Sequence, residues 1–389
     1  MFSEKFCAAT WFGIRNENNG DFRVCCQHDV SLTKYSGKVN FNIKNDSVND
    51  WVNSDYLQYI REQLGNNVEL PECRRCWTRE SAGLTSLRQN FNESISDNIP
   101  LNQNIWLKKY FQNKKNYLLD HLLIADVKIS NFCNFECASC NPWDSSKLYT
   151  KWLQNQQFDL IKQSDEYFNN IKQTFRDSIT TNYIAEILQQ PIKVLKILGG
   201  EPLLDSRLLQ MLENLDDKKK KKISLSFVTN GSVDLIRTDQ KLSGFKHITY
   251  VVSVDGFGKL NEYIRMGSVW DQIENNILSF KNKNIPNRTV KLFGVIQALN
   301  ALHIPELRNW CEQNNLEIKF GFVDTPAYLS LSALPYEQRK QVTDNQVLKL
   351  LESFPFNEED YLNFKKYINW YNYGDQRSAN ATASCESSK

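Results

Sequence analysis

The chain has 389 residues, of which 41% are hydrophobic and 12% aromatic, so it can bury a full core in more than one domain. The formal net charge of +2 gives no clear signal for nucleic acid or for a membrane surface. The N-terminal segment MFSEKFCAATWF lacks a basic region followed by an apolar run, and no window reaches the ~18 apolar residues of a membrane span. We therefore expect a cytoplasmic protein without a membrane segment.

The cysteines are concentrated in the first part of the chain. Eight of the ten precede residue 141, whereas Cys311 and Cys385 stand alone and the four histidines are scattered. In a reducing compartment this grouping favours metal ligands over disulfides, and the scattered histidines argue against a multi-histidine zinc hydrolase. We interpret Cys311 as a buried packing residue and Cys385 as an exposed thiol.

Residues 1–100 contain short apolar runs interrupted by Asn, Gly and Ser, as in NENNGDF and KNDSVNDW. Such interruptions are typical of turns, so we predict a small, cysteine-rich, loop-rich domain that needs a metal to hold it together. Residues 101–121 are assigned to a linker helix.

From residue 122 onward, short β-rich runs alternate with helical stretches. The runs are LLIADVKIS, IKVLKILGG, KISLSFVTNG, HITYVVSVDG, TVKLFGVIQALN and LEIKFGFVDT. Six strands separated by helical segments predict an α/β fold over residues 122–330, with a parallel sheet or barrel. In such folds the chemistry lies at the carboxyl ends of the strands, where the sequence places Cys133, Gly199, Gly200, Glu201, Asn230, Ser253, Asp255 and Asp324.

The last part of the chain has a helical pattern. We predict C-terminal helices over residues 331–373 that cover the open side of the barrel. The final stretch, residues 374–389, is polar and built of small residues, so we expect a disordered tail.

The stretch SNFCNFECASCNPWDSS places Cys133, Cys137 and Cys140, the cysteine triplet, in one loop with C-x3-C-x2-C spacing. Three thiolates can hold three irons of a [4Fe-4S] cluster and leave the fourth iron open for another ligand. Structural zinc is the alternative, but a triplet without a nearby fourth Cys or His is an incomplete tetrahedral set.

In this spacing and in the motifs that follow it, the chain resembles the radical S-adenosylmethionine (SAM) enzymes, whose cysteine loop follows the first strand of a partial (βα)6 barrel. LGGEP at 198–202 looks like their second-strand motif. The resemblance implies that Gly199 and Gly200 let the backbone approach the cofactor and that Glu201 accepts hydrogen bonds from the SAM ammonium. Asn230, at the end of the next strand, is a further candidate for SAM binding.

VVSVDG at 251–256 resembles the family's fourth-strand motif, which implies that Ser253 and Asp255 lie near the ribose hydroxyls. EYIRMGS then places Arg265 where related enzymes with extra clusters often carry an arginine for the methionine carboxylate. Ser139 departs from the family pattern, because the residue before the last cysteine is commonly aromatic there.

A second set of cysteines lies in the first hundred residues. Cys7, Gly20 and Cys25 give the spacing C-x12-G-x4-C, and CRRC adds Cys73 and Cys76. This resembles half of the cysteine pattern of SPASM and twitch domains, which hold auxiliary iron–sulfur clusters, usually after the barrel. Four cysteines would fill every iron of an auxiliary [4Fe-4S] cluster. Cys26 is then spare or replaces Cys25, and a four-cysteine zinc site is the alternative.

The resemblance implies reductive cleavage of SAM to a 5′-deoxyadenosyl radical that abstracts a hydrogen atom from the substrate. It also implies a flavodoxin- or ferredoxin-type electron donor, since the chain shows no flavin or nicotinamide motif. Among the substrates of auxiliary-cluster enzymes we favour a ribosomally made peptide. The rival hypothesis is a non-enzymatic, zinc-stapled binding protein on a βα scaffold.

Overall fold

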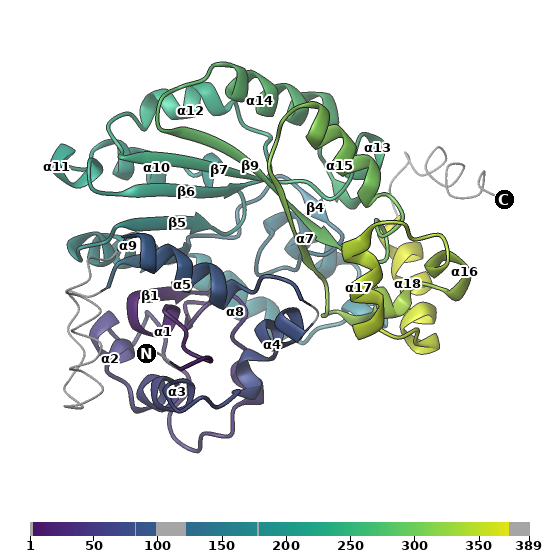
Figure 1. Ribbon diagram of the computed structural model, residues 1–389, viewed down its shortest axis with the longest axis horizontal. Coiled ribbons are helices and arrows are strands. Elements are labelled where there is room, and N and C mark those ends of the chain that lie inside the picture. The colour runs from purple at the N-terminus through teal and green to yellow at the C-terminus, as the bar shows by residue number, and fades with distance from the viewer. Residues whose placement is uncertain (1–2, 82, 99–121, 177–178, 373–389) are drawn as a thin grey trace.

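The computed structural model describes residues 3–81, 83–98, 122–176 and 179–372 (Figure 1). One sheet runs through the molecule in the order β10-β9-β7-β6-β5-β3-β1-β2, and β4 and β8 form a separate pair. The strands are β1 (Gly13–Asn16), β2 (Phe22–Arg23), β3 (Ile124–Lys128), β4 (Glu136–Cys137), β5 (Val194–Leu198), β6 (Ser224–Thr229), β7 (His247–Ser253), β8 (Arg265–Met266), β9 (Arg288–Ile296) and β10 (Ile318–Phe322).

Each of the six predicted β-rich runs contains one strand of the sheet. These strands, β3, β5, β6, β7, β9 and β10, pair in parallel with one another. The helices between them are α7 (Ser146–Gln154), α8 (Asp165–Arg176), α9 (Ile179–Gln189), α10 (Ser206–Glu213), α11 (Asp217–Lys220), α12 (Leu235–Lys241), α13 (Lys259–Ile264), α14 (Trp270–Asn282) and α15 (Ile304–Gln313). The predicted α/β partial barrel is confirmed, and the carboxyl ends of its strands share one edge.

The central strands are held by an apolar face that packs against the helices. Side chains of β6 and β7 alternate between buried and half-buried positions, as expected for strands with one packed face. Phe227 stacks on Tyr250 with 5.9 Å between ring centroids, and Phe280 of α14 meets Tyr250 edge-on at 5.0 Å. The other face of these two strands carries the half-buried residues, several of them polar.

The N-terminal segment adds two strands to this same sheet. Strand β1 lies parallel to β3, and β2 returns antiparallel to β1. Phe22 of β2 is fully buried, stacks on Trp51 at 5.9 Å and meets Tyr183 of α9 at 5.7 Å. The sequence predicts a separate domain over residues 1–100, but the sheet and the core continue across that boundary. A four-residue strand among turn residues is too short to be recognised from its pattern.

The remaining helices lie at the two ends of the described chain. Those of the N-terminal segment are α1 (Ala9–Phe12), α2 (Val48–Val52), α3 (Asp55–Gly65), α4 (Arg74–Ser81) and α5 (Leu87–Asn98). The predicted C-terminal helices are found as α16 (Tyr336–Arg339), α17 (Asn345–Ser353) and α18 (Glu358–Tyr371). The predicted linker helix at 101–121 and the tail at 374–389 lie outside the described residues.

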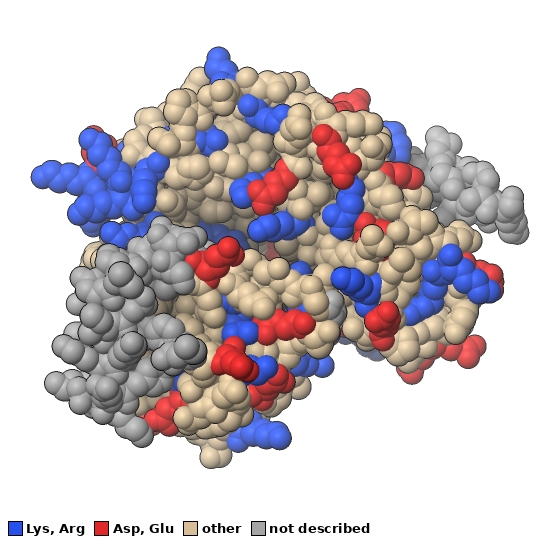
Figure 2. All heavy atoms as spheres, viewed as in Figure 1, with Lys and Arg blue, Asp and Glu red and all other residues tan. Residues whose placement is uncertain are grey.

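Positive charge is concentrated at one end of the molecule. Figure 2 shows Lys and Arg side chains clustered at the end of the molecule where Figure 1 places α11, and the run from Lys218 to Lys222 is exposed except for Lys220. This run precedes β6, so it lies at the amino edge of the sheet, away from the edge that carries the predicted site. In the described part of the chain, no helix combines the length and the apolarity that a membrane span requires.

Candidate functional site

The cysteine triplet lies in the loop that leaves the carboxyl end of β3. Cys137 is buried, whereas Cys133 and Cys140 are half-buried. Burial raises the pKa of Cys137 to about 12, and the nearby thiol of Cys133 adds to the rise. Burial likewise raises the pKa of Cys140, with Asp144, Cys137 and Cys133 adding to it. Burial therefore favours the neutral thiols, and bound cations would be needed to hold them as thiolates.

The loop is packed directly against the Gly-Gly-Glu turn at residues 199–201. The Glu201 N–H donates to Phe132 O at 2.7 Å. Gly199 and Gly200 have φ of +91° and +53°, and a Cβ on Gly200 would lie 2.2 Å from Phe132 O. Only glycine fits this position, because any side chain would push the cysteine loop off the end of β5. The two glycines therefore let the turn lie against the cysteine loop, and their approach to the cofactor stays a prediction.

Glu201 is buried, and its carboxylate is largely occupied. One oxygen, Oε1, accepts from Thr229 Oγ1 at 2.7 Å and from Leu203 N at 3.1 Å, and Oε2 accepts from Asn230 N at 2.5 Å. Burial raises the pKa of Glu201, although the three donors favour the ionised form. A carboxylate has about four lone-pair sites, so one is left for a further donor. Glu201 thus ties the ends of β5 and β6 together beside the cysteine loop.

The predicted SAM-binding residue Asn230 faces the triplet. Its Nδ2 donates to Asn134 Oδ1 at 2.8 Å and lies 4.0 Å from Cys133 Sγ. Its Oδ1 accepts from Ser232 N at 2.9 Å. Asn230 therefore holds the loop around the first cysteine.

Asp255 and Arg265 form an ion pair next to the second cysteine. Asp255 accepts from Arg265 Nη1 at 2.9 Å and from Val295 N at 2.8 Å, so both of its oxygens are used inside the protein. Strand β8 pairs with β4, which places Arg265 opposite Cys137. The Arg265 Nε–H has no hydrogen-bond partner among the described residues. Ser253 is half-buried at the end of β7.

The cysteine triplet would hold the cluster that the resemblance implies, with Arg265 beside it. Within the described residues, no group of three or more His, Cys, Asp or Glu side chains is arranged to hold a single metal ion. A [4Fe-4S] cluster differs from a single ion because each thiolate binds its own iron. The triplet supplies three sulfur ligands, and Arg265 supplies an adjacent cation with a free donor. These residues fit a cluster with one open iron.

A feature that sequence reasoning missed is the contact of α18 with the cysteine loop. The Tyr367 hydroxyl donates to Ala138 O at 2.7 Å, and the Tyr371 hydroxyl lies 2.9 Å from Glu136 O and 3.1 Å from Ile264 O. The carbonyls of Glu136 and Ala138 flank Cys137 in the chain. The two buried rings stack with 5.7 Å between centroids. Tyrosines four residues apart share a helix face, but no sequence pattern tells which carbonyls they reach.

Replacing Tyr371 by Phe is expected to weaken the contact between α18 and the cysteine loop while the fold persists, because the ring stays and only the hydroxyl donor is lost. A buried hydrogen bond contributes about 1 kcal/mol, so Tm should fall by only about 2 °C. Iron bound by the triplet should leave faster when a chelator is added under anaerobic conditions. The matched control is Tyr361→Phe on the same helix, whose ring lies against Phe356. Equal iron loss from both variants would show that the hydroxyl contact is unimportant.

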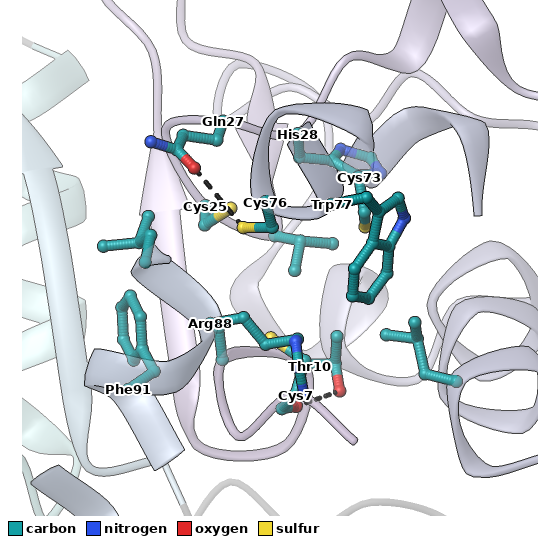
Figure 3. A pocket seen from close by; sticks show the side chains of 14 residues that line it. Cys7, Thr10, Cys25, Gln27, His28, Cys73, Cys76, Trp77, Arg88 and Phe91 are labelled. Carbon is teal, nitrogen blue, oxygen red and sulfur yellow. Dashed lines mark hydrogen bonds between the residues drawn. The ribbon is translucent and has the colours of Figure 1, made fainter. Parts of the chain in front are cut away.

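The four N-terminal cysteines, Cys7, Cys25, Cys73 and Cys76, line one pocket. Figure 3 shows their sulfur atoms around its middle, with Cys25 and Cys76 on one side and Cys73 nearer Trp77. Burial raises the pKa of Cys7 to about 12, and the cation of Arg88, which also lines the pocket, opposes the rise. Cys26 is exposed and is not part of this lining. The structure therefore brings together the four cysteines that the sequence groups.

Other residues near this pocket were not singled out by the sequence. His28 is buried in its wall, with Nε2 3.2 Å from the Tyr56 hydroxyl, and burial lowers its pKa to about 4, so the imidazole is neutral. Arg75, next to Cys76 on α4, pairs with Asp324 beyond β10 at 2.8 Å. The predicted strand-end residue Asp324 thus anchors the N-terminal segment to the last strand. Cys311 is buried in the core, as its packing interpretation expects, and Cys385 lies outside the described residues.

Comparison with known proteins gives one family match. Residues 127–311 match the model of the Radical SAM superfamily. No curated protein matches the chain. Similar solved structures include anSMEcpe with bound AdoMet, at 19% identity and a TM-score of 0.39 over 60% of each chain. Another is Streptococcus suis SuiB bound to the precursor peptide SuiA, at 14% identity and a TM-score of 0.37 over 81% of this chain and 66% of that one.

These identities are too low to carry the activities of the solved proteins over to this chain, which spans about 60% of the length of the first of them. The family match, in contrast, covers the cysteine triplet, the Gly-Gly-Glu turn and the Asp255–Arg265 pair. Residues 127–311, the segment that carries these features, are thus similar to the radical SAM superfamily of enzymes.

Proposed function

We propose that the chain binds SAM at a [4Fe-4S] cluster held by the cysteine triplet and cleaves it reductively, so that a hydrogen atom is taken from a substrate. The observation that carries this proposal is the meeting of the cysteine loop, the Gly-Gly-Glu turn and Arg265 at the carboxyl edge of one parallel sheet. Three thiolates leave one iron open, which is what a chelating cofactor requires.

The residues around the triplet have distinct roles in this proposal. A reduced cluster held by the triplet would supply one electron to bound SAM, which would break the C5′–S bond and give methionine and a 5′-deoxyadenosyl radical. Arg265, fixed by Asp255, offers its unpaired Nε–H to the SAM carboxylate. Glu201 offers its remaining lone pair to the ammonium, while Asn230 and Ser253 face SAM from the neighbouring strand ends.

We further propose that the N-terminal cysteines hold an auxiliary [4Fe-4S] cluster. This is supported by their shared pocket and by Arg88, a cation that would offset the charge of several thiolates. The exposed position of Cys26 favours Cys25 as the ligand. Twitch and SPASM domains, which these cysteines resemble, usually follow the barrel, whereas here the cysteines precede it.

Substituting Cys73 and Cys76 together by Ser is expected to remove about four irons per chain, the content of one cluster. Iron and zinc are measured by mass spectrometry on anaerobically purified protein. Cys26→Ser is the matched control and should keep its full iron content. Loss of iron from the control, or full iron in the double variant, would contradict the ligand assignment.

The substrate that we infer is a ribosomally made peptide, because an auxiliary cluster beside a radical SAM barrel is typical of peptide-modifying enzymes. The electron donor would be a flavodoxin- or ferredoxin-type protein. A peptide encoded beside this gene is the first substrate to test. A mass change that needs SAM and reductant supports the assignment, and an unmodified peptide contradicts it.

The activity itself is tested with anaerobic protein, dithionite and SAM, by measuring 5′-deoxyadenosine and methionine with mass spectrometry. We expect a brown protein with about seven to eight irons, the sum of two four-iron sites, that releases both products. A colourless protein with stoichiometric zinc and no 5′-deoxyadenosine would instead support the zinc-stapled binding protein.

A further inference from the structure

The β1–β2 hairpin links the two cysteine sites physically. Cys7 precedes α1 and β1, and Cys25 is the second residue after β2, so both lie toward the open end of the hairpin. The hairpin turn, residues 17–21, lies at the other end. It is closed by hydrogen bonds from Glu17 N to Asp21 O at 2.9 Å and from Gly20 N to Glu17 O at 2.8 Å. Gly20, with φ of +86°, allows this tight turn.

Asn18 in the hairpin turn reaches the cysteine loop. Its side chain is buried, and its Nδ2 donates to Trp143 O at 2.8 Å and to Asp144 Oδ1 at 2.7 Å. Since both partners are acceptors, they fix the orientation of the amide. The Asn18 Oδ1 atom therefore faces the Gly-Gly-Glu turn. It lies 2.8 Å from the position that a Cβ on Gly199 would take. One side chain thus touches both the segment after Cys140 and the turn that holds Glu201.

Half-buried charges hold Asn18 and the cysteine loop together. Lys128 Nζ lies 2.8 Å from Asp144 Oδ1 and 2.7 Å from Glu17 Oε2, so it joins β3, the loop and the hairpin turn. Asn141 Nδ2 donates to Asp144 Oδ2 at 2.9 Å. Asp144 therefore accepts hydrogen bonds from β3, from its own loop and from the hairpin turn. Asn18 is the donor from the hairpin turn, which lies between Cys7 and Cys25 in the sequence.

The β1–β2 hairpin can transmit a change in backbone position from the end near Cys7 and Cys25 to the turn at residues 17–21. Strand β1 is paired along its whole length with β3 and is joined on its other side to β2. Phe22 of β2 is packed between Trp51 and Tyr183. Paired strands and packed cores move as units, so ordering the chain around Cys7 and Cys25 also orders the hairpin turn.

We propose that Asn18 is a positioning residue that couples occupancy of the N-terminal cysteine site to the geometry of the cysteine loop that binds SAM. The inference rests on the proposed function and adds a dependence between two sites.

The first test compares Asn18→Ala with Asn19→Ala in the full chain containing its iron. The Asn19 side chain pairs with Asp21 inside the hairpin turn and provides the matched control. For Asn18→Ala we expect unchanged iron content and a SAM dissociation constant raised about fivefold or more, the lower end of couplings between two sites of one protein. The electron paramagnetic resonance spectrum of the reduced triplet cluster with SAM should change as well. Wild-type affinity and spectrum in Asn18→Ala would overturn the proposal.

The second test is a double-mutant cycle, which separates coupling from a merely structural role. Cys73→Ser with Cys76→Ser is introduced into the wild-type and the Asn18→Ala proteins. We expect the cysteine substitutions to weaken SAM binding in the wild-type background and to have little further effect when Asn18 is absent. Additive effects in the two backgrounds would overturn the coupling.

Hydrogen exchange provides a readout that does not need the cysteine variants to fold. In Asn18→Ala, amides of residues 131–146 should exchange faster than in Asn19→Ala, and equal exchange would overturn the proposal.

The outcomes of these tests also separate this inference from the proposed function. A wild-type protein that does not bind SAM refutes the function, whereas a wild-type protein that binds SAM with an unaltered Asn18→Ala variant refutes the coupling alone.

Discussion

Replacing Cys133, Cys137 and Cys140 together by Ala is expected to abolish 5′-deoxyadenosine formation. Without the triplet, no iron with an open position can be held at the carboxyl edge of the sheet, so SAM has no electron source. The N-terminal pocket keeps its own four cysteines. The variant should therefore retain about four irons, the content of one cluster, while product formation falls to the background of the assay.

The matched control for this variant is Cys311→Ala, which removes a buried thiol from α15 far along the chain from the triplet. It should keep its full iron content and its activity, apart from a small loss of stability. Formation of 5′-deoxyadenosine by the triple variant at the wild-type rate would refute the triplet as the SAM-binding site.

Glu201→Gln is expected to weaken SAM binding by roughly ten- to a hundredfold, since a hydrogen bond to a charged group contributes about 1.5–3 kcal/mol and 1.4 kcal/mol is a factor of ten. The structure adds a second reason. The carboxylate accepts from Leu203 N, Thr229 Oγ1 and Asn230 N, and the amide group of Gln would turn a donor toward one of these donors. Calorimetric titration with SAM measures the effect.

Thr229→Val distinguishes the two reasons, because it removes one donor to Glu201 and leaves the carboxylate in place. If Glu201 contacts the SAM ammonium, Thr229→Val should bind SAM much better than Glu201→Gln does. Similar losses in both variants would assign Glu201 to holding β5 and β6 together, and unaltered affinity in Glu201→Gln would remove it from the site.

The barrel strands could be predicted because each combines several signals. The run VLKIL at β5 is short, apolar and followed by Gly199 and Gly200, and SLSFVT at β6 alternates apolar and polar residues before an Asn-Gly turn. Parallel pairing then places the strand ends at one edge, which brings the triplet loop, Glu201 and Asp255 into one region. Sequence order and strand direction together were enough to place these residues in one region.

The partners of the site residues could not be predicted, because they come from distant segments. Asp255 resembles a ribose-binding residue in sequence, yet its two oxygens are taken by Arg265 and Val295. Tyr371 lies more than a hundred residues after Arg265 and still contacts the neighbouring carbonyl of Ile264. Such hydrogen bonds depend on how helices and loops pack, which no local pattern encodes.

The N-terminal segment shows a different limit. Its cysteine spacing correctly grouped four thiols that line one pocket, since this grouping depends on residue type. Its attachment to the barrel was missed, because β1 has four residues and β2 two, too few for a periodic pattern to be visible. The contact of Asn18 with Asp144 follows from that attachment.

The central claim is that the triplet leaves one iron open and that SAM binds to it. The most direct measurement is pulsed electron paramagnetic resonance of the reduced protein with SAM labelled with ¹⁵N in its amino group. We predict a hyperfine coupling between the ¹⁵N nucleus and the cluster in the wild-type protein, and its loss in the variant without the triplet. A reduced cluster that shows no coupling to labelled SAM, in a protein that binds SAM by calorimetry, would contradict the account.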